Sequence, residues 1–431
     1  MATRRHKKHK EPCQEDTILK VEKMKENRVV ITGVGPVSAI GIGREPFFAG
    51  LREGRSGIAA ITSFDTAPYR SKLAAEIAHF DVKEYLESEK TYLDRASELA
   101  FAGMSLALED ADLDARKLDS GGTALLLGSA LGNLGTLGLF FDDFVKKGPR
   151  LVKPILFPHT YSNTTISLLA IEYGLTGYHV NFSAGAVSAS DAIMEGYDLI
   201  RQGRAKIALT GGFEAFSELL FAGFQRRGLL SPLAGAREVC APFDQGRDGF
   251  VLGEGCGILV LEELESAQAR GATIYGEIVG AGMVGDSSVD SAGGGAWILE
   301  AMKRALKGLP FDERDLDLIS ANANGSPQLD GNEGRAIASL IERDSVGIPV
   351  SSIKSLIGET LGASGALQMI AAVAAIEDGF IPAIHNLETP DHGLDIDVVR
   401  GAGEARNVHR VLLNTIDPGG SIVSFAIQGL K

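Results

Sequence analysis

Apolar runs that predict buried strands alternate along the chain with stretches that predict helices, and short glycine-rich turns separate them. "RVVITGVGPVSAIG" (28–41) is typical of a buried strand followed by a glycine-rich turn, and 122–132 and 205–216 each predict a further strand. The stretch 93–114 has apolar residues at helical spacing on nearly every face. It therefore predicts a helix that is buried on several sides.

The second half of the chain continues the pattern. The runs 256–264 and 272–284 predict two adjacent strands around a short helix, and "LDLISANANG", "IPVSSIKS" and "RVLLNTIDPGGSIVSFAI" predict strands in the last third. Alternating strands and helices with short connections indicate an α/β fold whose sheets are covered on both faces. A glycine pair at a strand end occurs once in each half, in "TGGFEAF" and in "DPGGSIVSF", which suggests two related halves.

Composition narrows the class of protein. The 431 residues, 45% of them hydrophobic, suffice for two core-forming halves, and no apolar run reaches the roughly 18 residues of a membrane span. The net charge of −14 argues against general nucleic-acid binding. Residues 1–27 contain a basic cluster without a secretory apolar stretch, which predicts a disordered, solvated tail or a weak electrostatic tether to an acidic surface.

Cysteine usage points to a reducing compartment. The three cysteines, Cys13, Cys240 and Cys256, are too few and too far apart for a disulfide framework or a spaced metal site. We therefore expect a cytoplasmic protein with no metal and no cofactor.

Four stretches together carry a resemblance to a known family. They are 28–41, 241–280 with its "DGFVLGEG" motif, 350–372 and 381–399. The chain resembles the β-ketoacyl-acyl-carrier-protein synthases, the elongating condensing enzymes of fatty acid and polyketide synthesis, over roughly residues 28–430. The resemblance implies a thiolase-like fold, with two similar halves (28–265 and 266–431) in a five-layer αβαβα arrangement and a dimer across central strands.

The resemblance also implies where the reacting groups would lie. In the family, a cysteine on a strand-to-helix turn takes the acyl chain, two histidines assist condensation, and two backbone N–H groups hold the thioester oxyanion. The cysteine position falls on Ala186 in "VNFSAGAVSASD", and the histidine positions fall on Asn322 and Glu359. The phenylalanine that gates the pocket and supplies one oxyanion N–H becomes Pro418, and proline has no N–H. Four separate losses predict that condensation chemistry is absent.

Other residues of the site match the family or leave alternatives open. Lys354, Asp330 and Glu333 occupy the family's supporting positions. A serine near the turn would need a base to replace the thiol, and no histidine occupies these motifs. Glu359 is interpreted either as a general base or, preferably, as the ion-pair partner of Lys354.

Two further groups of residues are candidates for binding. Leu131, Phe157 and Tyr161 match regions that line the family's acyl pocket and dimer contact, although plain core is the default interpretation of each. Arg226 and Arg227 are candidates for docking an acyl carrier protein, with solvated surface as the alternative.

Three functions follow as hypotheses. The first, which we prefer, is a chain-length-factor-like partner that forms a heterodimer with an active ketosynthase. The chain resembles that class because it keeps the full fold and lacks the nucleophile. It differs in detail, because the usual chain-length factors carry Gln at the position of Ala186. The second is an acyl-thioester enzyme of altered chemistry that uses Glu359 or Asp417. The third is a homodimeric acyl-binding scaffold.

Overall fold

The computed structural model describes residues 26–431 except 87, 234–236, 288–294, 342–346 and 431. The predicted tail therefore lies outside the described residues, apart from Glu26 and Asn27. Glu26 pairs with Arg201, and the Asn27 N–H donates to the Arg201 carbonyl oxygen at 3.0 Å. No described helix is long and apolar enough to cross a membrane.

One large mixed sheet contains two copies of the same strand order. Its path is β13-β11-β10-β15-β16-β9-β1-β8-β7-β5-β6, with β2 paired to β1. The strands are β1 (Val29–Ser38), β2 (Gly41–Ile42), β5 (Thr123–Gly128), β6 (His179–Phe182), β7 (Ile207–Glu214), β8 (Gly255–Glu263), β9 (Gly276–Gly285), β10 (Leu318–Ser320), β11 (Pro349–Ser351), β13 (Asp397–Val398), β15 (Arg410–Ile416) and β16 (Ser421–Gln428).

The repeat is visible when the strands of three or more residues in each half of this sheet are numbered in chain order. In both halves the third strand pairs with the second, the second with the fourth, the fourth with the fifth and the fifth with the first. Strands two, three and four run parallel and the fifth runs antiparallel, in both halves. The similarity of the two halves that the glycine pairs suggested is thus present in the topology. The predicted boundary at 265/266 falls within α7 (Leu264–Ala269), between the two repeats.

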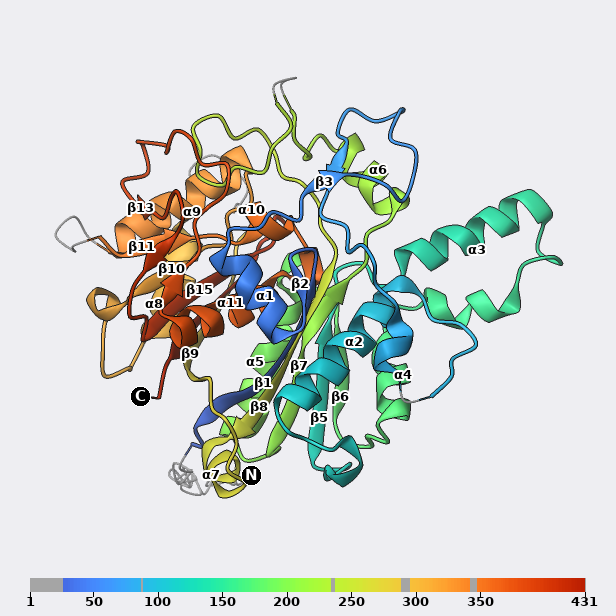
Figure 1. Ribbon diagram of the computed structural model, residues 1–431, viewed down its shortest axis with the longest axis horizontal. Coiled ribbons are helices and arrows are strands. Elements are labelled where there is room, and N and C mark those ends of the chain that lie inside the picture. The colour runs from blue at the N-terminus through green and yellow to red at the C-terminus, as the bar shows by residue number, and fades with distance from the viewer. Residues whose placement is uncertain (1–25, 87, 234–236, 288–294, 342–346, 431) are drawn as a thin grey trace, which may run out of the picture.

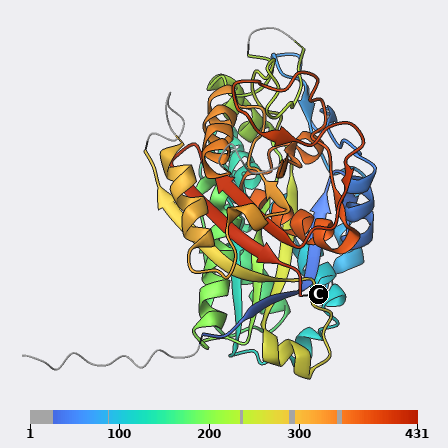
Figure 2. The same ribbon diagram turned by 90° about the vertical axis from the view of Figure 1, so that its left-hand side faces the viewer.

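Helices cover both sheet faces and fill the space between the halves (Figure 1). α2 (Arg95–Asp110) and α4 (Thr164–Glu172) pack on the outer face of the N-terminal half, and α8 (Ala296–Leu306) and α9 (Pro327–Leu340) on that of the C-terminal half. α5 (Ser188–Arg201) and α11 (Ser364–Asp378) share the central core. Five layers result, and Figure 2 shows the C-terminal half in front, with the N-terminal half behind. The remaining helices and short strands are α1 (Arg44–Arg52), α3 (Leu134–Lys147), α6 (Glu218–Arg226), α10 (Lys354–Ile357), β3 (Ala59–Ala60), β4 (Leu73–Ala74), β12 (Phe380–Ile381) and β14 (Glu404–Ala405).

Side chains of β5 point alternately to the two faces of the sheet, and both faces are buried. In β5, Leu125 and Leu127 pack into the outer core with α2, while Leu126 packs into the central core with α5. Successive strand side chains point to opposite faces, so a strand buried on both faces must be apolar throughout. This confirms the α/β fold with covered sheets.

Two expectations about strands were wrong. The runs at 256–264 and 272–284 form β8 and β9, but these are not neighbours, because β1 lies between them and pairs with both. β1 also continues through the glycines that were expected to start a turn. A Cβ at Gly35 would lie 1.9 Å from the Gly103 carbonyl oxygen, so glycine there lets α2 pack directly on the strand.

Candidate functional site

The turn between β6 and α5 holds the predicted nucleophile position. Ala186 lies in the short 3-10 turn Gly185–Val187 at the start of α5, and it is buried. Its methyl group offers no heteroatom. Its N–H donates to Asp417 Oδ1 at 2.8 Å.

The serines near this turn stabilise local structure. Ser188 Oγ donates to the Gly185 carbonyl oxygen at 2.7 Å and accepts from the Ala184 N–H at 2.9 Å. Ser190 Oγ accepts from Thr415 Oγ1 at 2.8 Å, which joins α5 to β15. None of these three contacts involves an imidazole, so a serine nucleophile gains no support from them.

The two predicted histidine positions are joined through one lysine. Lys354 Nζ, at the start of α10, donates to Asn322 Oδ1 and to Glu359 Oε2, each at 2.8 Å. All three side chains are buried. The ion pair that we expected between Lys354 and Glu359 is present.

Glu359 is surrounded by hydrogen-bond donors. Besides Lys354, Oε2 accepts from Asn324 Nδ2 at 2.8 Å, and Oε1 accepts from the Leu361 N–H at 2.9 Å and Ser364 Oγ at 2.7 Å. Burial by itself would raise the pKa of Glu359, but the Lys354 ammonium and these hydrogen bonds outweigh burial and lower the pKa. A general base needs a pKa near the working pH, so this environment favours the ion-pair interpretation.

Asn322 is oriented by three contacts. Its N–H donates to Glu333 Oε1 at 2.8 Å, and its Oδ1 also accepts from the Ile416 N–H at 3.0 Å. Its Nδ2 has no hydrogen-bond partner among the described residues. An amide in this arrangement does not titrate, so it cannot transfer a proton as an imidazole does.

Asp330 and Glu333, on α9, hold the segment that follows β10. Asp330 accepts the N–H groups of Asn324, Gly325 and Phe243 at 3.0 to 3.2 Å. Glu333 Oε1 also accepts from Asn414 Nδ2 at 3.2 Å, and burial raises the pKa of Glu333 to about 7. Both carboxyl groups bind protein N–H groups, which indicates a structural role for the supporting positions.

The loop 417–420, which contains the predicted gate position, contacts the turn at Ala186 through its aspartate. Pro418 itself is exposed, and Asp417 is half-buried. Asp417 Oδ2 accepts the Gly419 N–H at 2.6 Å, while the Gly420 carbonyl oxygen accepts the Asp286 N–H at 2.7 Å. This loop therefore brings a carboxylate, and no N–H of residue 418, to the turn.

The pocket candidates lie on an open surface in the single chain. Leu131, Phe157 and Tyr161 are each about half exposed, and the rings of Phe157 and Tyr161 pack edge to face with centroids 5.4 Å apart. They adjoin α3, which projects from the body in Figure 1. Arg226 and Arg227 are exposed at the end of α6. Acyl binding by the first group and carrier docking by the second stay predictions.

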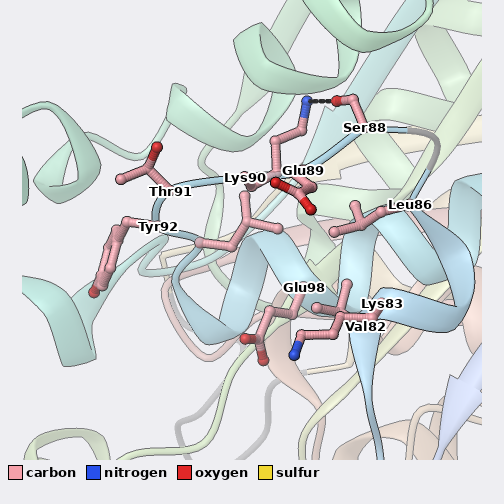
Figure 3. A pocket seen from close by; sticks show the side chains of 10 residues that line it. Val82, Lys83, Leu86, Ser88, Glu89, Lys90, Thr91, Tyr92 and Glu98 are labelled. Carbon is pink, nitrogen blue, oxygen red and sulfur yellow. Dashed lines mark hydrogen bonds between the residues drawn. The ribbon is translucent and has the colours of Figure 1, made fainter.

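A hollow elsewhere on the surface is separate from these positions. A pocket of about 720 Å³ is lined by residues of the 82–93 segment and by Glu98 of α2 (Figure 3). In it Lys90 Nζ donates to Ser88 Oγ at 2.7 Å. None of the predicted site residues lines this pocket.

Metal and thiol chemistry find no support within the described residues. They contain no cluster of His, Cys, Asp and Glu side chains that could hold a metal ion. Cys240 and Cys256 are buried, and burial raises the pKa of both thiols. Cys13 lies outside the described residues.

Sequence reasoning missed two polar residues of this region. Asn324 donates to Glu359, and Glu214 accepts the N–H groups of Ala130, Leu131 and Gly362. Burial raises the pKa of Glu214 to about 7. A glutamate at the end of the buried run 205–216 was the available signal, since a buried carboxyl group needs partners.

Comparison with known families decides the classification. Residues 26–267 match the model of the β-ketoacyl synthase N-terminal domain, and residues 275–388 match that of the C-terminal domain. The chain belongs to the β-ketoacyl synthase family. The described fold is thus the thiolase-like ketosynthase fold that the resemblance implied.

Proteins that are similar in sequence and in structure support the same classification. The chain is 36% identical to 3-oxoacyl-[acyl-carrier-protein] synthase 2 of a Synechocystis species, over 94% of this chain and 99% of that one. It is 33% identical to the protein of the same name in Staphylococcus aureus, over 91% and 96%. Among solved structures, "The ishigamide ketosynthase/chain length factor" superposes with a TM-score of 0.89 at 31% identity, over 94% of this chain and 100% of that one. A β-ketoacyl synthase from Burkholderia phymatum gives 0.86 at 29%, with the same coverage. The chain is therefore a ketosynthase-family protein of fatty acid or polyketide synthesis.

Proposed function

We propose that this chain is a non-condensing member of the β-ketoacyl synthase family that acts as the partner subunit of an active ketosynthase. The observation that carries the proposal is Ala186, which stands at the head of α5 without a heteroatom and with its N–H bound to Asp417. A condensing site needs a thiolate and a free N–H pair at this point. Asn322 and Glu359 add to the case, because both are engaged by Lys354.

The unpaired edge of β6 is consistent with a partner subunit. β6 pairs on one side with β5, and within the described sheet its other edge is free. A free strand edge presents unpaired N–H and C=O groups that another chain can bind. The dimer across central strands that the resemblance implied would use this edge.

Exposed apolar side chains gather on α3, on the segment after it and on α4. We call them the α3 face: Leu139, Phe141, Phe144 and Val145 on α3, Leu151, Ile155, Phe157 and Tyr161 after it, and Ile171 on α4, each at least 44% exposed. A large patch of exposed apolar side chains usually marks an interface, and permanent interfaces bury roughly 2,000 Å² or more. If an active ketosynthase bound the α3 face, side chains such as Phe157 would line the pocket of that partner. This chain would contribute no nucleophile.

Two solved structures that are similar to this chain are consistent with such an assembly. One is a ketosynthase/chain length factor, and another is a type II polyketide synthase acyl-carrier protein in complex with its ketosynthase. The second aligns with a TM-score of 0.85 at 28% identity, over 94% of this chain and 100% of that chain. For this chain, a ketosynthase partner and an acyl carrier protein as a further ligand are our proposal, as is a cytoplasmic location.

The test of the lost chemistry uses the purified chain with acyl and malonyl carrier proteins. We expect no β-ketoacyl product by mass spectrometry above a no-protein control, with an active ketosynthase as the positive control. Ala186→Cys should also stay inactive, because the loss of one oxyanion donor alone costs about 2.7–4 kcal/mol of transition-state stabilisation. Product from either protein would overturn the claim.

The test of partnership is co-expression with a Cys-His-His ketosynthase of the same organism, followed by affinity purification and light scattering. A one-to-one complex that changes the chain length of the ketosynthase's products supports the proposal. A homodimer that never exchanges with any such ketosynthase defeats it and favours the scaffold hypothesis. An acyl-thioester activity that Glu359→Gln abolishes would favour the altered-enzyme hypothesis instead.

A further inference from the structure

The carboxylate of Asp417 joins two segments that are 231 residues apart in the sequence. Oδ1 accepts the Ala186 N–H at 2.8 Å, and Oδ2 accepts the Gly419 N–H at 2.6 Å. Both oxygens are therefore used, one by the turn before α5 and one by the loop 417–420. Hydrogen bonds to a charged acceptor are stronger than neutral ones.

Glycines make room for this carboxylate on both sides. A Cβ at Gly185 would lie 2.0 Å from Asp417 Oδ1, and a Cβ at Gly419 would lie 2.5 Å from Oδ2. Gly185 also has a φ of 65°, which side-chain-bearing residues rarely adopt. The backbone thus fits closely around a carboxylate at this place.

The local field favours a negative group. The 14-residue helix α5 begins directly after the turn, and the N-terminal end of a helix carries partial positive charge. In a condensing enzyme the N–H at this position would face the oxygen of the substrate thioester, where negative charge develops. In this chain a side-chain oxygen already accepts that N–H.

We infer that the Asp417 carboxylate occupies the position where the oxygen of a substrate thioester would lie in a condensing enzyme. The same carboxylate joins the loop 417–420 to the turn at Ala186. The loop is held at further points, since the Gly420 carbonyl oxygen accepts the Asp286 N–H at 2.7 Å and the Asp417 N–H donates to the Ser421 carbonyl oxygen at 2.8 Å. The site is closed to a thioester carbonyl by the protein itself. This inference is independent of whether the chain pairs with a ketosynthase.

Hydrogen exchange at the Ala186 N–H tests the inference in the full chain. In Asp417→Ala the exchange rate of this amide should rise by about tenfold or more, because a charge-assisted hydrogen bond is lost. Asp417→Asn keeps an acceptor oxygen without the charge and should give an intermediate rate. Asp312→Ala, which removes an exposed carboxylate elsewhere, should leave the rate unchanged.

Acetate provides a rescue that a merely structural role would not predict. Added acetate should slow exchange at Ala186 in Asp417→Ala, because the anion takes the vacated place, and should have no effect on the wild type or on Asp312→Ala. An unchanged exchange rate in Asp417→Ala, or a raised rate that acetate does not reverse, would overturn the inference. If Asp417→Ala does not fold, an Asp417→Asn rate equal to the wild-type rate would overturn it.

Discussion

Replacement of Lys354 by methionine is expected to destabilise the fold strongly. Lys354 and Glu359 are buried, and their charged atoms lie 2.8 Å apart. Loss of one partner of a buried pair leaves an uncompensated charge, which costs about 3–5 kcal/mol of unfolding free energy. Glu359 keeps three neutral donors in Lys354→Met, namely Asn324, Ser364 and the Leu361 N–H, so we expect the lower end, about 3 kcal/mol.

A double-mutant cycle separates the pair from its surroundings. Glu359→Gln leaves the Lys354 ammonium with only amide oxygens and should also cost about 3 kcal/mol, whereas the double variant should cost far less than the sum. Equilibrium urea unfolding, followed by circular dichroism, gives the four free energies. Lys146→Met, which breaks the exposed pair with Asp142, is the control and should leave the midpoint unchanged. A coupling energy below about 1 kcal/mol would refute the view that the two charges act as a unit.

Two further predictions concern a buried carboxyl group and the surface. The pKa of Glu333 is raised to about 7, so the folded state keeps a proton that the unfolded state loses above pH ~4.5. Glu333 should therefore contribute up to about 3 kcal/mol of stability that is lost as the pH rises from ~4.5 to ~7. Glu214, whose pKa is also raised to about 7, adds a fall of its own over this range. Urea midpoints of Glu333→Gln should therefore fall less with pH than those of the wild type, while those of exposed Glu84→Gln should fall as much as the wild type's. Val145→Asp, on the α3 face, should shift assembly toward monomer by light scattering, whereas Trp297→Asp, an exposed apolar position on α8, should not; equal behaviour of the two variants would contradict the proposed interface.

The fold was predictable from sequence because strong apolar periodicity and family motifs agree with each other. The run at 205–216 became β7, and the helix expected in 93–114 became α2, buried on several sides. The order of the strands in the sheet could not be predicted from the sequence. Nothing in the runs around β8 and β9 shows that β1 lies between them, because pairing depends on residues more than 200 positions away.

The site was predictable in its positions and only partly in its contacts. Motif register brought Asn322, Lys354 and Glu359 together, and the preferred ion pair formed as expected. The contact of Asp417 with Ala186 was not foreseen, although Asp417 had been considered as a reactive group. A loop aspartate has many local hydrogen-bonding options, and only the folded backbone shows which N–H it reaches.

The residues at the predicted catalytic positions form hydrogen bonds with the polar groups around them. A working site keeps donors and acceptors free for its substrate, whereas buried polar groups elsewhere in a protein are paired. Here Lys354 binds Asn322 and Glu359, and Asp417 binds the Ala186 N–H, so the polar groups at the predicted catalytic positions bind each other. Asn322 Nδ2 and Glu333 Oε2 are exceptions among the described residues of this network. Unpaired backbone groups and exposed apolar side chains lie instead on the surface of the described chain, at the free edge of β6 and on the α3 face, and these are the groups that the proposed second subunit would cover.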